Sequence, residues 1–120
     1  MTILIVDDSK DFRIIMSALV RSDTALGAVL EAQDGMEALE LVLRERPRIV
    51  VMDVMMPRLD GFQATRLIKE EWPETRVIVV SSERDDSCES QAFTHGADAF
   101  IDKSDITSAL LPAIRRLLER

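Results

Sequence analysis

The sequence has only one cysteine, Cys88, in 120 residues, so the chain cannot form an internal disulfide. This excludes a small scaffold held by disulfides and makes a reducing, intracellular setting the simplest expectation. No apolar run approaches the roughly 20 residues that cross a bilayer. The chain also turns acidic at Asp7 and Asp8, where a secretory signal would have a basic start and a longer apolar stretch. We therefore expect a cytoplasmic protein without a membrane segment.

Positive charge is also scarce, because 15 basic side chains face 22 acidic ones and the formal net charge is -7. Proteins that bind nucleic acid directly need a basic patch to neutralise phosphates, so we do not expect this domain to do so. An acidic surplus of this size is ordinary for solubility and is compatible with metal binding. The position of the acidic residues is therefore more informative than their number.

Linkers, internal repeats and low-complexity segments are absent as well. A chain of this length corresponds to about one domain, and it hides roughly two-thirds of its unfolded surface on folding. We therefore expect residues 1–120 to form a single domain with one sizeable core.

Short β-branched runs alternate with amphipathic segments along the chain. The runs are nearly continuous apolar stretches, which is typical of strands buried on both faces of a parallel sheet. In the segments between them, apolar residues recur at helical spacing. Five such βα units predict an α/β fold with a doubly wound sheet, helices on both faces and strand order 2-1-3-4-5. The predicted strands are Ile3–Val6, Ala28–Ala32, Ile49–Met52, Val77–Val80 and Ala99–Ile101; the helical apolar positions are Phe12, Ile15, Met16, Leu19 and Val20, then Met36, Leu39, Val42 and Leu43, then Gly61, Ala64, Leu67 and Ile68, and finally Ile106, Leu110, Ala113, Ile114 and Leu117.

Helix boundaries can be predicted from caps and breakers. Ser9 is a good cap for the first helix, Pro47 and Pro73 close the second and third, and Gly96 follows the fourth. Pro112 falls inside the last helical pattern, where it removes a backbone donor, so we expect a kink or a late helix start there.

Polar residues follow four of the five predicted strands. They are Asp7 and Asp8 after the first, Asp53 after the third, the Ser81 and Ser82 pair after the fourth, and Lys103 after the fifth. In an open α/β sheet, ligands bind outside the carboxyl ends of the strands. Each residue alone is an ordinary cap, turn or surface residue, but together they predict three carboxylates, a hydroxyl and an ammonium at one edge.

Three clustered carboxylates require a counter-ion. Mg²⁺ is the natural candidate because it prefers hard oxygen ligands and commonly keeps water and phosphate oxygens in its shell. A carboxylate can accept a phosphoryl group, while a cation, a lysine and a hydroxyl stabilise the charge on its oxygens. The set therefore points to phosphoryl transfer.

Four segments carry a resemblance to a known family: LIVDDS at 4–9, DVMMPRLDG at 53–61, VIVVSS at 77–82 and HGADAFIDK at 95–103. In this order, at the ends of strands, they make the whole chain similar to the receiver domain of response regulators in two-component signalling. The resemblance implies a flavodoxin-like (βα)5 sandwich of three layers. It also implies a phosphorylation-controlled switch that catalyses only its own phosphorylation and dephosphorylation and is not otherwise an enzyme.

The resemblance implies a role for each matching residue. Asp53 would accept the phosphoryl group from a sensor histidine kinase or a phosphotransfer protein. Asp8 would bind Mg²⁺ directly and Asp7 mainly through water, with Asp53 and the backbone carbonyl of Met55 as further ligands. The Met55 thioether is too soft a ligand for Mg²⁺, so only its carbonyl is credible. Glu83 and Met55 lie at positions that influence how long the phosphate lasts in this family.

The same resemblance implies a switch. Ser81 would move to the phosphate, Lys103 would pair with a phosphate oxygen, and Phe100 would turn inward as Ser81 moves. These changes would reshape the face formed by the fourth helix, fifth strand and fifth helix, where an effector or a second copy of the chain docks. The other interpretation of Phe100 is a plain core aromatic. Cys88, His95 and Trp72 are interpreted as structural or surface residues.

One position departs from the family pattern, because Ser104 follows Lys103 where proline, commonly after a cis bond, is usual. A cis bond before serine costs about 3 kcal/mol relative to trans, so the peptide is either strained or trans.

Other functions remain as alternatives. A Mg²⁺-dependent phosphatase-like hydrolase that passes through an aspartyl-phosphate would need a second acid two residues after the nucleophile, where Met55 stands. A flavin-binding module would need a phosphate-cradling loop in place of Asp7 and Asp8. A scaffold without phosphorylation would not need the acid set. The sequence leaves open whether the domain stands alone or belongs to a longer regulator.

Overall fold

The computed structural model describes residues 1–82 and 86–119. Five strands alternate with five helices along the chain, and two 3-10 helices lie between them. In chain order they are β1 (Thr2–Val6), α1 (Lys10–Arg21), η1 (Thr24–Leu26), β2 (Ala28–Ala32), α2 (Gly35–Glu45), β3 (Ile49–Asp53), α3 (Gly61–Glu71), β4 (Arg76–Ser81), α4 (Asp86–Thr94), β5 (Ala99–Asp102), η2 (Lys103–Asp105) and α5 (Ile106–Leu118).

The strands form one parallel sheet in the order β2-β1-β3-β4-β5, which confirms the predicted topology. Each predicted strand is present, and the observed bounds differ from the predicted ones by at most one residue at each end. The register places Val6 of β1 opposite Met52 of β3 and Asp53 opposite Val80 of β4. The ends of β1, β3 and β4 are therefore level with one another at one edge of the sheet.

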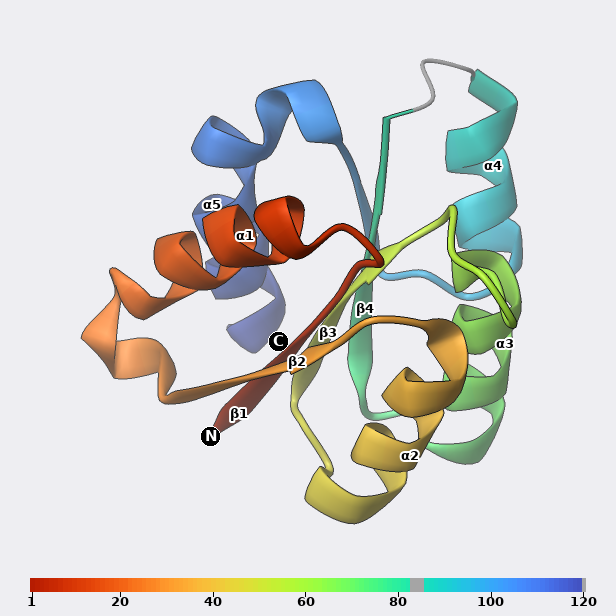
Figure 1. The fold of residues 1–120 in the computed structure, drawn as a ribbon, viewed down its shortest axis with the longest axis horizontal. Coiled ribbons are helices and arrows are strands. Elements are labelled where there is room, and N and C mark those ends of the chain that lie inside the picture. The colour runs from red at the N-terminus through yellow and green to blue at the C-terminus, as the bar shows by residue number, and fades with distance from the viewer. Residues whose placement is uncertain (83–85, 120) are drawn as a thin grey trace.

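Helices cover both faces of the sheet (Figure 1), and an apolar layer lies beneath them on each face. On one face, Ile3, Ile5 and Val51 pack beneath α1 and α5. On the other face, Leu4, Val50 and their neighbours pack beneath α2, α3 and α4. Successive strand residues thus point to opposite layers, and both layers are buried. Strands in this sheet are therefore apolar on both faces, which is why nearly continuous apolar runs predicted them correctly.

The apolar faces of the helices are narrower than their sequence pattern suggested. Four pattern residues lie largely in solvent: Ile15 at 43%, Met36 at 42%, Leu43 at 59% and Leu67 at 42% exposure. A helix that packs on a sheet buries only the residues nearest its line of contact, such as Met16 and Val20 in α1. Within the described ranges, no helix is both long and apolar enough to cross a membrane.

The predicted helix boundaries mostly hold. The Ser9 side chain accepts a hydrogen bond from the Phe12 amide and caps α1. Helices α2 and α3 end at Glu45 and Glu71, just before the two prolines, and Gly96 follows α4 with φ 101°. The alternative of a late start for the last helix is wrong, because α5 begins at Ile106 and contains Pro112. Pro112 lies on the exposed side of α5, where its ring does not compete with core packing.

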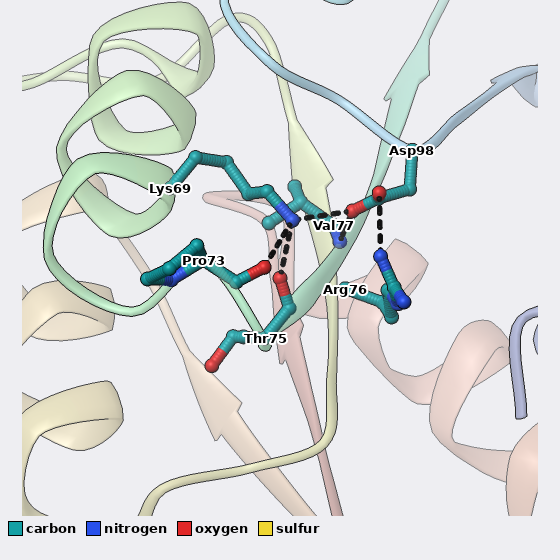
Figure 2. Close-up of polar contacts among 6 residues, drawn as sticks. All are labelled: Lys69, Pro73, Thr75, Arg76, Val77 and Asp98. Carbon is teal, nitrogen blue, oxygen red and sulfur yellow. Dashed lines mark hydrogen bonds and ion pairs between the residues drawn. The ribbon is translucent and has the colours of Figure 1, made fainter. Parts of the chain in front are cut away.

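At the opposite edge, where the strands begin, Lys69 joins three segments (Figure 2). Its Nζ donates to the carbonyls of Pro73 at 3.0 Å and Thr75 at 2.8 Å, and it pairs with Asp98 Oδ2 at 2.9 Å. Asp98 also accepts from the Val77 amide at 2.9 Å and from Arg76 at 3.4 Å. The end of α3, the start of β4 and the segment before β5 are thereby held together.

Candidate functional site

Three carboxylates meet where β1 and β3 end. Asp53 is the last residue of β3, and Asp7 and Asp8 follow β1, its neighbour in the sheet. Asp7 and Asp53 are buried and Asp8 is exposed. One carboxylate oxygen from each residue can be chosen so that all three lie within 4.8 Å of one another. The predicted convergence of these acids is therefore present, with two at the floor of the site and one at its mouth.

The Lys103 ammonium lies between the two buried acids. Its Nζ is 2.8 Å from Asp7 Oδ2 and 3.1 Å from Asp53 Oδ1. Lys103 begins η2, directly after β5, and its Nζ also lies 4.4 Å from the centre of the Phe12 ring on α1. The aromatic face adds an attractive cation–π contact to the two ion pairs. Among residues 1–82 and 86–119, one ammonium thus serves a cluster of three carboxylates, which leaves an excess of negative charge among these groups.

Burial and the neighbouring charges shift the pKa of both Asp53 and Lys103. Burial and the nearby carboxylate of Asp7 raise the pKa of Asp53 to about 6, although Lys103 opposes the shift. Burial alone would lower the pKa of Lys103, but its close contact with Asp7 and the charge of Asp53 outweigh burial and raise it. The site therefore favours additional positive charge next to Asp53.

The donor set fits a hard divalent cation such as Mg²⁺, because it consists of carboxylate oxygens. Asp7 Oδ1 accepts from the Ser9 amide at 2.9 Å, while among the described residues the buried Oδ2 accepts no hydrogen bond and has only the ion-pair contact with Lys103 at 2.8 Å. Asp8 makes no such contact within the described part of the chain and is open to solvent. This difference fits direct coordination by Asp8 and a water-mediated role for Asp7. Met55 follows in the loop after β3 and is 62% exposed.

The predicted switch residues lie on the two neighbouring strands. Ser81 ends β4 and is buried, and the thiol of Cys88 on α4 donates to its Oγ at 3.4 Å. Phe100 on β5 is half-buried and packs against the core layer beneath α2, α3 and α4. Its ring is therefore neither fully inward nor free in solvent. Glu83, expected to influence phosphate lifetime, lies outside the described residues.

The peptide bond between Lys103 and Ser104 is trans, because no peptide bond among the described residues is cis. Asp102 Oδ1 accepts hydrogen bonds from both the amide and the hydroxyl of Ser104 at 2.9 Å. A proline could make neither bond. With this peptide bond in the trans form, Lys103 still contacts the carboxylates of Asp7 and Asp53.

Two contributors to the site were missed in the sequence. Arg13 donates to the Asp7 carbonyl at 2.7 Å and also pairs with Glu31 at 3.2 Å, which fixes the backbone at the end of β1. Cys88, interpreted as a structural or surface residue, donates from its thiol to the hydroxyl of Ser81. Neither has a local sequence signal, because each contact joins segments that only the fold brings together. His95 and Trp72 do have structural contacts, with Phe62 and Arg46 respectively.

Comparisons with known proteins agree with this geometry. The family model described as "Response regulator receiver domain" matches residues 3–115. The chain is 48% identical over 103 residues to protein-glutamate methylesterase/protein-glutamine glutaminase 4 of Myxococcus xanthus, covering 84% of the chain and 29% of that protein. It is 39% identical over 121 residues to response regulator MprA of Mycobacterium leprae, covering 100% of the chain and 52% of that protein. The chain thus spans about a third to a half of these relatives.

A similar solved structure is the response regulator domain of Thermotoga maritima CheB, with a TM-score of 0.91 and 32% identity. The match covers 100% of the chain and 97% of that domain, so the whole fold is shared.

Proposed function

The chain belongs to the family of response regulator receiver domains, which are phosphorylation-controlled signalling switches, and we propose that Asp53 is the residue that accepts the phosphoryl group. The observation that supports this role is the placement of Lys103 Nζ between Asp53 and Asp7, with Asp8 open to solvent beside them. A phosphoryl group on Asp53 would arrive between a fixed ammonium and the acids that hold its counter-ion.

Asp8, Asp7, Asp53 and the carbonyl of Met55 are proposed to hold Mg²⁺. When bound, this ion would neutralise charge on the transferred phosphoryl oxygens. Lys103 would contact one of those oxygens, which requires it to exchange its present carboxylate contacts for the phosphate. Ser81 would donate its hydroxyl to another oxygen, and Phe100 would turn inward into space that Ser81 leaves. The half-buried position of Phe100 is compatible with movement in that direction.

The partners follow from this chemistry. A sensor histidine kinase or a phosphotransfer protein would supply the phosphoryl group in a cytoplasmic phosphorelay. An effector, or a second copy of the chain, would bind the face formed by α4, β5 and α5 once the switch has moved. No nucleic acid or membrane contact is proposed for this domain, and its chemistry is confined to its own phosphorylation and hydrolysis. The methylesterase activity in a relative's name is not proposed for these residues.

The phosphatase alternative finds no support in the site. A general acid and base would be needed two residues after Asp53, and that position holds the exposed thioether of Met55.

The proposal is tested by incubating the protein with Mg²⁺ and acetyl phosphate. We expect one phosphoryl group to be added, detected as a mass increase of the intact protein and removed by hydroxylamine. Asp53→Asn should abolish the adduct, because the nucleophile is gone. Asp60→Asn is the matched control, since Asp60 caps α3 on the same loop but outside the cluster. An adduct that persists in Asp53→Asn would contradict the assignment.

A further inference from the structure

The loop between β3 and α3, residues 54–60, contains a backbone conformation that is unfavourable for its residue. Arg58 has φ 68°, in the left-handed region that residues with a Cβ rarely adopt. The Leu59 amide donates to the Pro57 carbonyl at 2.8 Å, which closes a three-residue turn around Arg58. Turns of this type with positive φ are rare and strained. The conformation therefore needs support from outside the loop.

That support comes from Asp34, which lies 24 residues earlier in the chain. The Arg58 Nε and one terminal nitrogen hold both oxygens of Asp34, with contacts at 3.1, 2.9 and 2.8 Å. The Asp34 side chain is only 9% exposed and also caps α2 by accepting from the Glu37 amide at 2.9 Å. A two-pronged guanidinium contact of this kind fixes orientation as well as distance. The middle of the loop is thus fastened to the start of α2.

Burial would raise the pKa of Asp34, but the Glu37 amide and the Arg58 guanidinium outweigh it and hold the pKa below its usual value. The pair is therefore charged at neutral pH. Gly35 adds a steric component, because a Cβ there would lie 2.4 Å from the Leu59 carbonyl oxygen. The loop and the first turn of α2 meet at a distance that only glycine permits.

The ends of the same loop are fastened at the acid cluster. The Val54 amide donates to the Val80 carbonyl at 3.2 Å, and the Gly61 amide donates to the Val54 carbonyl at 2.9 Å. Between these two anchors lies Met55, whose carbonyl is the proposed backbone ligand. With both ends fixed, the path of the intervening backbone depends on where Arg58 is held.

We propose that the Asp34–Arg58 ion pair positions the loop after β3 and thereby sets the affinity of the acid cluster for a divalent cation. This inference rests on the proposed function, because it assigns the loop a ligand for the same cation. Arg58 and Asp34 are positioning residues in this proposal, since neither is expected to touch the ion.

A substitution pair separates positioning from simple charge. Arg58→Ala removes one positive charge and one Arg–Asp pair, and Arg115→Ala does the same with Asp23, where the arginine side chain is 55% exposed compared with 61% for Arg58. By charge alone, either change would leave Mg²⁺ binding unaltered or slightly stronger. We expect Arg58→Ala to weaken Mg²⁺ binding by about tenfold, as loss of an outer-shell partner does. Isothermal titration calorimetry with MgCl₂ measures both.

A double-mutant cycle tests whether the pair acts as a unit. Asp34→Ser keeps a good cap for α2 but removes the acceptor for Arg58. The double variant Asp34→Ser/Arg58→Ala should bind Mg²⁺ no more weakly than the single variant with the larger loss of affinity. Hydrogen exchange of the metal-free protein gives a readout without the ion. The amides of Met55, Met56 and Leu59 should exchange faster in Arg58→Ala and at the wild-type rate in Arg115→Ala.

The outcomes distinguish this inference from the proposed function. If the wild-type protein takes up phosphate and Mg²⁺ but Arg58→Ala binds Mg²⁺ as tightly as Arg115→Ala does, the positioning role is wrong and the proposed function stands. If the wild-type protein binds no Mg²⁺ and accepts no phosphoryl group, the proposed function fails, and the inference fails with it.

Discussion

Two lysines at opposite ends of the same sheet have equally buried side chains, each 16% exposed, yet their surroundings differ in charge balance. Lys69 meets one carboxylate, Asp98, and two backbone carbonyls, and Arg76 adds a second positive charge (Figure 2). Lys103 meets the carboxylates of Asp7 and Asp53, with Asp8 close by. Within the described part of the chain, Lys69 therefore lies in a satisfied network, whereas Lys103 lies in a network with more carboxylates than cations.

The difference separates a structural lysine from a functional one. Around Lys69 every named group has its partner, so the network can be at its free-energy minimum without a ligand. Around Lys103 the buried carboxylates also repel one another, and burial together with the charge of Asp7 raises the pKa of Asp53. A cation that binds such a site relieves the repulsion between the carboxylates and thereby stabilises the folded protein. The comparison can be tested by removing each lysine or each acid in turn.

The largest effect is expected for Lys69→Met. The substitution leaves Asp98 without its ammonium and the Pro73 and Thr75 carbonyls without their donor. Breaking such a pair costs about 3 kcal/mol of unfolding free energy or more. Urea unfolding at pH 7 measures the loss, and addition of Mg²⁺ should not restore it.

Lys103→Met is the counterpart of that change. It should also destabilise the protein, because Asp7 and Asp53 then face each other without a cation, but saturating Mg²⁺ should recover most of the loss. A Mg²⁺ response that is equal in the two variants would remove the distinction between the two ends of the sheet.

A smaller effect of opposite sign is expected for Asp53→Asn. The pKa of Asp53 is about 6 in the folded protein and 3.8 for the unperturbed group. Between these values the folded protein holds a proton that the unfolded chain has released, so stability falls as pH rises from about 4 to about 6 and remains lower above. Removing the charge should therefore stabilise the metal-free protein by roughly 2 kcal/mol at pH 8.

The pH dependence provides the control for this prediction. Thermal unfolding in EDTA should show little difference between Asp53→Asn and wild type at pH 4, where the folded protein holds the carboxyl protonated. Asp98→Asn should destabilise at pH 8, because Lys69 and Arg76 lose their carboxylate. If Asp53→Asn destabilises at pH 8 as well, the acid cluster is not strained.

We call the end of the sheet that carries Asp7, Asp53 and Lys103 the charge-rich edge. The sequence predicted this edge better than the opposite one, where Lys69 and Asp98 meet. Strand ends are visible as the places where β-branched runs stop, and a parallel sheet brings those ends together, so the convergence of Asp7, Asp53 and Lys103 could be predicted from the sequence alone. Lys69 and Asp98 gave no signal, because a single lysine on a helix is usually solvated and its partner lies 29 residues away.

The details of the charge-rich edge also exceeded what the sequence can predict. The bidentate contact between Arg58 and Asp34 depends on a positive φ at a residue that does not favour it. Elsewhere, Leu43 of α2 is 59% exposed although it shares the periodic pattern of the buried Val42, and the pattern does not show which of the two meets the sheet. Propensity and periodicity describe single elements, whereas these features arise between elements.

The smallest effect concerns Cys88, the only cysteine of the chain. Its thiol donates to Ser81 at the charge-rich edge, and it is 6% exposed. If Ser81 moves to a phosphoryl group on Asp53, Cys88 loses a partner and its packing on that side, so its reaction with a small thiol reagent should become about threefold faster, equivalent to less than about 1 kcal/mol. The rate is measured with and without acetyl phosphate and Mg²⁺, and Asp53→Asn should show no change.

Hydrogen exchange at the Val77 amide, bound by Asp98 at the other end of β4, should be the same in both states. Equal acceleration at the two ends would mean that phosphorylation loosens the whole domain, whereas acceleration confined to Cys88 places the movement at the edge whose charges are out of balance.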